Sequence, residues 1–86
     1  MKQFSYTVKD PLGIHTHLAG LLAQQAKTFN DTTVAITKGD TTVKTAQFMQ
    51  LIRLGVKRGD VITFSADGAN EDAAIQAMSD FCKKNL

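Results

Sequence analysis

The chain has 86 residues, of which 43% are hydrophobic and 21% charged, and its formal net charge is +2. This length fits one domain over residues 1–86 with a small core, because such a chain buries roughly 60–65% of its unfolded surface. The charge excess is too weak to indicate a nucleic-acid surface, and no apolar run is long enough for a membrane span. Since the N-terminus has no signal-peptide pattern, we expect a cytoplasmic protein that neither binds nucleic acid nor inserts into a membrane.

The first third of the chain predicts a strand, a turn and a helix. Phe4, Tyr6 and Val8 alternate with polar residues, as in a strand with one buried face. The segment Asp10–Gly13 combines proline and glycine, which is typical of a turn. Helical spacing then predicts a helix over about Thr16–Thr28, after which the pattern breaks. The residues that recur at helical spacing are Leu18, Leu21, Leu22, Gln25 and Phe29.

Three further strands and two further helices are expected. The strands are Thr32–Thr37, which is almost wholly β-branched, Thr41–Lys44 after a Gly-containing turn, and Val61–Ala66. Phe48–Leu54 suits a short amphipathic helix, and the last helix has this core stripe: Ala74, Ile75, Met78, Phe81 and Cys82. The element order is therefore βαββαβα, and we expect the helices to cover the one apolar face of the sheet.

Signals for helix ends support these boundaries. Gly55 is the expected residue just past the second helix, with Val56 making the hydrophobic contact behind it. Asn70 is the candidate N-cap of the last helix, and Glu71 and Asp72 suit the positive end of its dipole.

Side chains that could bind a metal or react as a thiol are sparse. Cys82 is the only cysteine, so no internal disulfide can form, and its place on a core stripe favours a buried apolar role. His15 and His17 are two residues apart, which on a helix points them about 200° apart. A metal site shared by these two histidines is therefore not expected.

His15 has the strongest chemical signal, because it lies where the first turn becomes the first helix. The first backbone N–H groups of a helix are unpaired and its dipole is positive, which suits a phosphate. The same positive end disfavours a protonated imidazole, so a neutral, nucleophilic ring is expected. Histidine is not a preferred N-cap. The pattern thus suggests a phosphorylatable histidine, but the local context alone leaves open a structural residue near the N-cap or a surface histidine without a function.

The segment Gly13–Gly20, with the sequence GIHTHLAG, resembles the active-site segment of HPr, the histidine-containing phosphocarrier protein of the bacterial sugar phosphotransferase system. Phe48–Val56 and Val61–Gly68 resemble the second helix and last strand of that family, so the resemblance covers essentially the whole chain. It implies an α+β fold, the HPr-like open-faced β-sandwich, in which three helices cover one face of a four-stranded antiparallel sheet. The chain departs from the family pattern at His17, where the family has arginine, and at Leu18, where it has proline.

The resemblance also implies a function and the residues that perform it. His15 would accept a phosphoryl group from phosphorylated enzyme I and pass it to a sugar-specific enzyme IIA, in a monomeric carrier without metal or cofactor. Such a carrier takes part in a relay and is not a stand-alone enzyme. The backbone N–H groups of Thr16 and His17 would stabilise the phosphate. The implied partner-docking residues are Gly20, Gln24, Lys27, Phe48, Met49, Gln50 and Ile52.

The departures leave alternatives open. His17 either replaces the arginine with a weaker, pH-dependent charge, or marks a changed chemistry, or is a tolerated surface substitution. Gln47 stands where many relatives have a serine that a kinase phosphorylates, so that control is not expected here. The alternative function is an HPr-like regulatory or interaction module with weak or no phosphocarrier activity, which would dock onto regulatory proteins through Phe48 and Met49. An RNA-binding domain is disfavoured, because the strands lack the aromatic stacking pair of such sheets.

Overall fold

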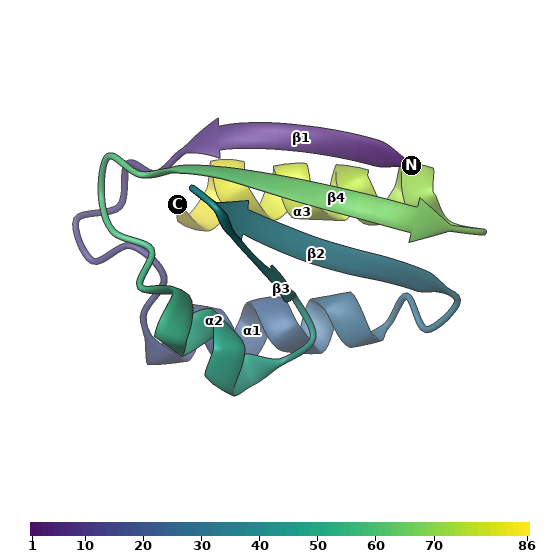
Figure 1. The fold of residues 1–86 in the computed structure, drawn as a ribbon, viewed down its shortest axis with the longest axis horizontal. Coiled ribbons are helices and arrows are strands. Elements are labelled where there is room, and N and C mark those ends of the chain that lie inside the picture. Colours follow the sequence, from purple (N-terminus) through teal and green to yellow (C-terminus); the bar gives the residue numbers. More distant parts are fainter.

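The computed structural model describes residues 1–86, and its elements follow the predicted order (Figure 1). The strands are β1 (Lys2–Thr7), β2 (Thr32–Lys38), β3 (Thr41–Lys44) and β4 (Val61–Gly68), and the helices are α1 (Thr16–Lys27), α2 (Phe48–Leu54) and α3 (Glu71–Asn85). The bounds differ from the predicted ones by one or two residues at the ends of β1, β2, β4 and α1. None of the helices combines the length and the apolar character needed to cross a membrane.

The strands form one antiparallel sheet with the order β1-β4-β2-β3. Alternation along β4 places Ile62, Phe64 and Ala66 on the face toward the helices, where they are fully buried. The other face is polar: the hydroxyls of Ser5 and Thr63 are hydrogen-bonded at 2.9 Å across β1 and β4. The predicted open-faced sandwich, with one covered and one free sheet face, is confirmed.

The core lies between the sheet and the three helices. Figure 1 shows α3 behind β1 and β4, while α1 and α2 lie side by side along the β2 and β3 half of the sheet. Helix α1 buries Leu18, Ala19, Leu22, Ala23 and Ala26. Full burial of one leucine is worth roughly 1.5–3 kcal/mol, so this face of α1 fixes which side of the helix packs into the core.

The expectation that Leu21 belongs to the core stripe is wrong, because its side chain is 40% exposed. At about 100° per residue, Leu21 lies roughly 130° from the centre of the face that α1 buries. The three small alanines of that face bring α1 close to its neighbours and define the buried side. Leu21 is therefore an exposed apolar residue on α1.

Gly55 and Asn70 lie at the helix ends where the sequence predicts them, but the Asn70 side chain bonds differently from a capping side chain. Gly55 ends α2 in the left-handed conformation, with φ 68°. Asn70 is the N-cap residue of α3, yet its side chain makes no capping bond. Its amide nitrogen donates instead to the Asp31 carboxylate, at 2.9 Å and 3.2 Å from the two oxygens. The side chain of Asn70 therefore ties α3 to the loop before β2.

Cys82 is a core residue, as the sequence predicts. Its thiol is buried on α3, and burial raises its pKa to about 12. A thiol with this pKa is almost wholly protonated at neutral pH and is a poor nucleophile. Cys82 is therefore inert in the folded protein.

Candidate phosphoryl-transfer site

His15 is the N-cap residue of α1, with an extended backbone (φ −98°, ψ 179°) and no side-chain capping hydrogen bond. Its carbonyl accepts the first helical hydrogen bond, from the Ala19 N–H at 2.8 Å. The N–H groups of Thr16, His17 and Leu18 precede that bond and donate to no other group in the fold. A half-buried imidazole thus lies beside three free donors at the positive end of a helix, which suits an anion attached to this ring.

Buried residues on both sides fix His15 at the surface. Ile14 and Leu18 are both about 6% exposed and belong to the core, whereas Thr16 and His17 are exposed. The chain therefore enters the core before His15 and again one turn into α1. The leucine at position 18, where the family pattern has proline, is accounted for by this burial.

Gly13 lets the chain approach the segment after α2. Its φ of 64° lies in the left-handed region that favours glycine. The next residue, Ile14, donates its N–H to the Val56 carbonyl at 3.1 Å. A Cβ on Gly13 would lie 2.2 Å from that carbonyl oxygen and 2.7 Å from the Lys57 Cα. The position of the His15 loop therefore depends on a residue without a side chain at position 13.

The turn against which Gly13 rests is itself held by charge and hydrogen bonds. The Asp60 carboxylate accepts the Lys57 N–H at 2.8 Å and pairs with the Lys38 ammonium at 3.2 Å. The Lys57 N–H, and after it Lys38, hold the pKa of Asp60 below its usual value. The Lys38 ammonium also donates to the Gly55 carbonyl at 2.8 Å, at the end of α2. This network joins β2, α2 and the turn that supports the loop before His15.

His17 lies beside His15, and the expectation that the two rings diverge is wrong. Their ring centroids are 6.4 Å apart and the ring planes differ by only 13°. The separation of about 200° expected for side chains two residues apart on a helix does not apply here, because His15 has extended backbone dihedrals and only His17 is within α1. The fold has no group of three or more His, Cys, Asp or Glu side chains that could hold a metal. The second imidazole thus extends the surface around the first.

The predicted docking residues lie on two neighbouring helices, α1 and α2. Met49 is 57% exposed, whereas Phe48 and Ile52 are half-buried and pack against the core. The Phe48 ring lies over α1, 3.8 Å from the point that a Cβ on Gly20 would occupy. The polar members of the set are exposed: Gln24, Lys27 and Gln50. The short α2 therefore directs Met49 outward and uses Phe48 mainly for packing.

Two exposed apolar residues, one in the loop before α1 and one on α1, were missed by the sequence reasoning. Leu12 is 70% exposed in the loop three residues before His15, and Leu21 is 40% exposed on α1. The angular position of Leu21 relative to the alanines of α1 is a sequence signal that could have identified it. For Leu12 no such signal exists, because loop residues have no periodicity.

The segment before α2 offers no exposed hydroxyl. Gln47 is the exposed N-cap residue of α2 and lacks a hydroxyl group. Thr45 is fully buried, and its hydroxyl oxygen has no hydrogen-bond partner. A kinase acting on the folded protein finds no substrate group at either position.

Comparison with known proteins decides the family. Residues 2–84 match the family model described as "PTS HPr component phosphorylation site". The chain belongs to the HPr family of phosphotransferase-system phosphocarrier proteins. Among its HPr relatives is the phosphocarrier protein HPr of Mycoplasma genitalium, which is 34% identical over 85 residues, or 99% of this chain and 97% of the relative.

Solved HPr structures show the same fold. The HPr of Thermoanaerobacter tengcongensis matches with a TM-score of 0.91 and 31% identity, covering 98% of this chain and 93% of the other. The histidine-containing phosphocarrier protein of Mycoplasma matches with a TM-score of 0.89 and 30% identity, covering 93% and 90%. The predicted family and the predicted fold are both confirmed.

Proposed function

We propose that His15 is the phosphoacceptor of this HPr-family carrier. The observation that supports this most directly is the position of its imidazole, which is free of capping bonds beside three unpaired N–H groups at the start of α1. The lone pair of the unprotonated ring nitrogen, Nδ1 by resemblance to the family, attacks the phosphorus of a donor phosphohistidine. The bond between phosphorus and the donor nitrogen breaks, and its electron pair stays on the donor ring.

The N–H groups of Thr16 and His17 stabilise the transferred phosphoryl group. They are fixed by the helix before the phosphate arrives, so no reorganisation is needed as the charge is transferred. The His17 side chain adds a donor, but not the permanent charge and fixed fork of donors that an arginine has. This residue therefore holds the phosphoryl group less firmly than an arginine would.

The donor and acceptor that we propose are enzyme I and a sugar-specific enzyme IIA, which a monomeric carrier meets in turn in the cytoplasm. Both dock on one surface over α1 and α2, formed by the residues Gly20, Gln24, Lys27, Phe48, Met49, Gln50 and Ile52. The exposed Leu21 belongs to the same surface. Exposed apolar side chains grouped near a reactive group are typical of an interaction site.

Phosphotransfer kinetics with substituted docking residues test this proposal. Leu21→Asp and Met49→Asp should each raise the KM for phosphorylated enzyme I and leave the unfolding midpoint nearly unchanged, because both side chains are exposed. Val61→Asp is the matched control, since Val61 is also 57% exposed but lies at the start of β4. Equal effects of all three substitutions would place docking elsewhere. Transfer from the phosphorylated parent to enzyme IIA completes the test.

A further inference from the structure

The turn between α2 and β4 brings a lysine next to the loop that leads to His15. Figure 1 shows this turn and the loop before α1 side by side, and the Ile14 N–H donates across them to the Val56 carbonyl at 3.1 Å. A Cβ on Gly13 would lie 2.7 Å from the Lys57 Cα. His15 follows Gly13 by two residues, which span at most about 7 Å of chain, and five single bonds of about 1.5 Å let a lysine side chain extend about 6 Å. The two side chains therefore start close enough together for the lysine ammonium to meet a group on the His15 ring.

The backbone of Lys57 is fixed, whereas its ammonium has no partner. The Lys57 N–H donates to the Asp60 carboxylate at 2.8 Å, and the Lys57 carbonyl accepts the Asp60 N–H at 3.0 Å. The side chain is exposed, and its ammonium takes part in none of the ion pairs of the fold. The Asp60 carboxylate is paired instead with the Lys38 ammonium at 3.2 Å. The N–H of Lys57 lowers the pKa of Asp60 most, and the charge of Lys57 lowers it least. The Lys57 charge is thus available to another anion.

A phosphoryl group on His15 finds little permanent positive charge on α1 itself. Such a group brings about 1.5–2 negative charges at neutral pH. Helix α1 has no acidic residue, but its one lysine, Lys27, is the last residue, about 16 Å along the axis from the first. Asp10, in the loop before His15, adds a negative charge. A cation that is rooted beside this loop therefore complements the site.

We propose that the Lys57 ammonium pairs with the phosphoryl group on His15 and supplies the permanent positive charge that His17 lacks. This inference rests on the proposed role of His15 as phosphoacceptor. The N–H groups at the start of α1 hold the phosphoryl oxygens from the helix side, and the ammonium donates to one of them from the α2–β4 turn. When the group leaves, the flexible lysine side chain returns to solvent. Lys57 thereby stabilises the phosphorylated form of the carrier.

The equilibrium constant for phosphoryl transfer between enzyme I and the carrier tests this role. A residue that only docks the partner changes the forward and reverse rates by the same factor, because it touches neither free product. A residue that pairs with the phosphoryl group stabilises one product and shifts the equilibrium. Lys57→Met should shift it about two- to fivefold toward phosphorylated enzyme I, since exposed charge pairs are individually modest. Lys57→Arg keeps the charge and should restore most of the parent's value.

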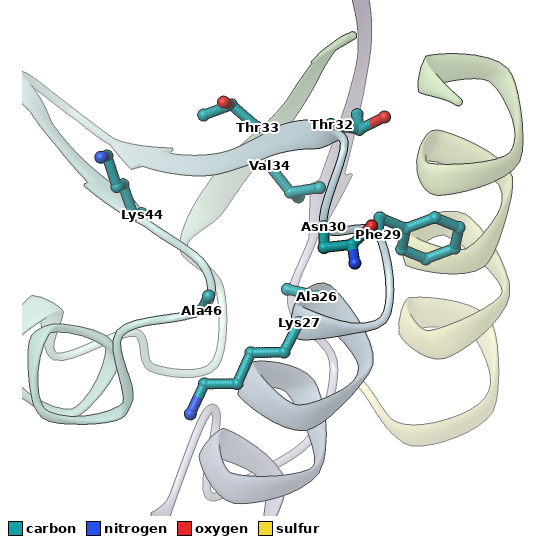
Figure 2. Close-up of a pocket in the computed structure, with 9 residues that line it drawn as sticks. All are labelled: Ala26, Lys27, Phe29, Asn30, Thr32, Thr33, Val34, Lys44 and Ala46. Carbon is teal, nitrogen blue, oxygen red and sulfur yellow. The ribbon is translucent and has the colours of Figure 1, made fainter. Parts of the chain in front are cut away.

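Three comparisons separate this pairing from other effects of charge. Lys44→Met is the matched control, because Lys44 is an exposed lysine opposite Ala35 on the free sheet face, and Figure 2 shows its side chain pointing away from α1. It should leave the equilibrium unchanged. Arg58→Gln removes the next charge of the same turn and should shift the equilibrium less than Lys57→Met does. Raising the salt from 0.1 M to 1 M should shrink the effect of Lys57→Met, because the Debye length falls from about 10 Å to about 3 Å.

Intact-mass measurement of both proteins at equilibrium gives the result. A Lys57→Met variant with the parent's equilibrium constant and the parent's urea midpoint would overturn the proposal. An equal shift in Lys44→Met would do the same, because net charge alone would then account for it, and so would an equal shift in Arg58→Gln. A parent that gains no phosphoryl group would contradict the proposed function itself, whereas a phosphorylated parent with an unshifted Lys57→Met contradicts only the role of Lys57.

Discussion

Substitution of Gly13 by alanine should destabilise the protein more than its small volume suggests. Alanine in the left-handed region costs about 1–2 kcal/mol, of which roughly 0.4–1 kcal/mol is recovered by a more restricted unfolded chain. A Cβ only 2.2 Å from the Val56 carbonyl oxygen forces that backbone to move. The move breaks the 3.1 Å bond from Ile14 and leaves buried polar groups unpaired, at about 1–3 kcal/mol. We expect a total loss of about 2–4 kcal/mol.

Urea unfolding of Gly13→Ala and Gly39→Ala measures the part that comes from the close approach. Gly39 has nearly the same φ, 59°, but nothing within 4 Å of its absent Cβ, so it reports the backbone conformation alone. Its substitution should cost about 1 kcal/mol or less. Gly13→Ala should also slow phosphoryl transfer, because the displaced loop includes His15, whereas Gly39→Ala should not. Equal losses of stability in the two variants would refute the reasoning.

Three further substitutions follow from the structure. Lys38→Met should lower the free energy of unfolding by about 1 kcal/mol at pH 7, because it removes the donor to the carbonyls at the end of α2. The Asp60 carboxyl has a lowered pKa, so its stabilisation is present above the ordinary pKa of about 3.9 and is lost as the pH falls through the lowered value. The stability gap between Lys38→Met and the parent should therefore narrow as the pH falls through the lowered pKa of Asp60, but it should not close, because the bonds to the α2 carbonyls do not titrate; a gap that does not change with pH contradicts the pairing. Thr45→Val should be neutral or stabilise by up to about 1 kcal/mol in urea unfolding, because the buried hydroxyl has no partner; a clear loss would show that it has one. His17→Arg should speed transfer from enzyme I about two- to fivefold, since an exposed guanidinium has a permanent charge and a fixed fork of donors; an arginine variant no faster than the parent contradicts this role for His17.

The fold was predictable because several local signals agreed. Alternation in β4, the β-branched run of β2 and the glycine at the end of α2 each identify one element, and the resemblance to HPr supplies their arrangement. Burial on α1 was harder to predict. Leu21 matches the apolar spacing, but the buried face is set by the alanines that let α1 approach its neighbours. Size as well as hydrophobicity decides which residues pack inside.

The candidate site was predictable in sequence position but not in geometry. The placement of His15 at the start of α1 follows from the preceding turn and the helical spacing. The near-parallel rings of His15 and His17 do not, because the extended dihedrals of the N-cap residue cancel the helical angle between the two side chains. The anchor of Gly13 on Val56 joins residues 43 positions apart, a contact that only the fold supplies.

Intact-mass measurement after incubation with enzyme I and phosphoenolpyruvate tests the central claim most directly. The parent should gain one phosphoryl group that is labile in acid and stable in base, as expected for phosphohistidine. His17→Ala should still gain it, more slowly, whereas His15→Ala should gain none while unfolding at nearly the parent's urea concentration. Phosphorylation of His15→Ala as readily as the parent would contradict the account, because the phosphoryl group would then be carried by another residue.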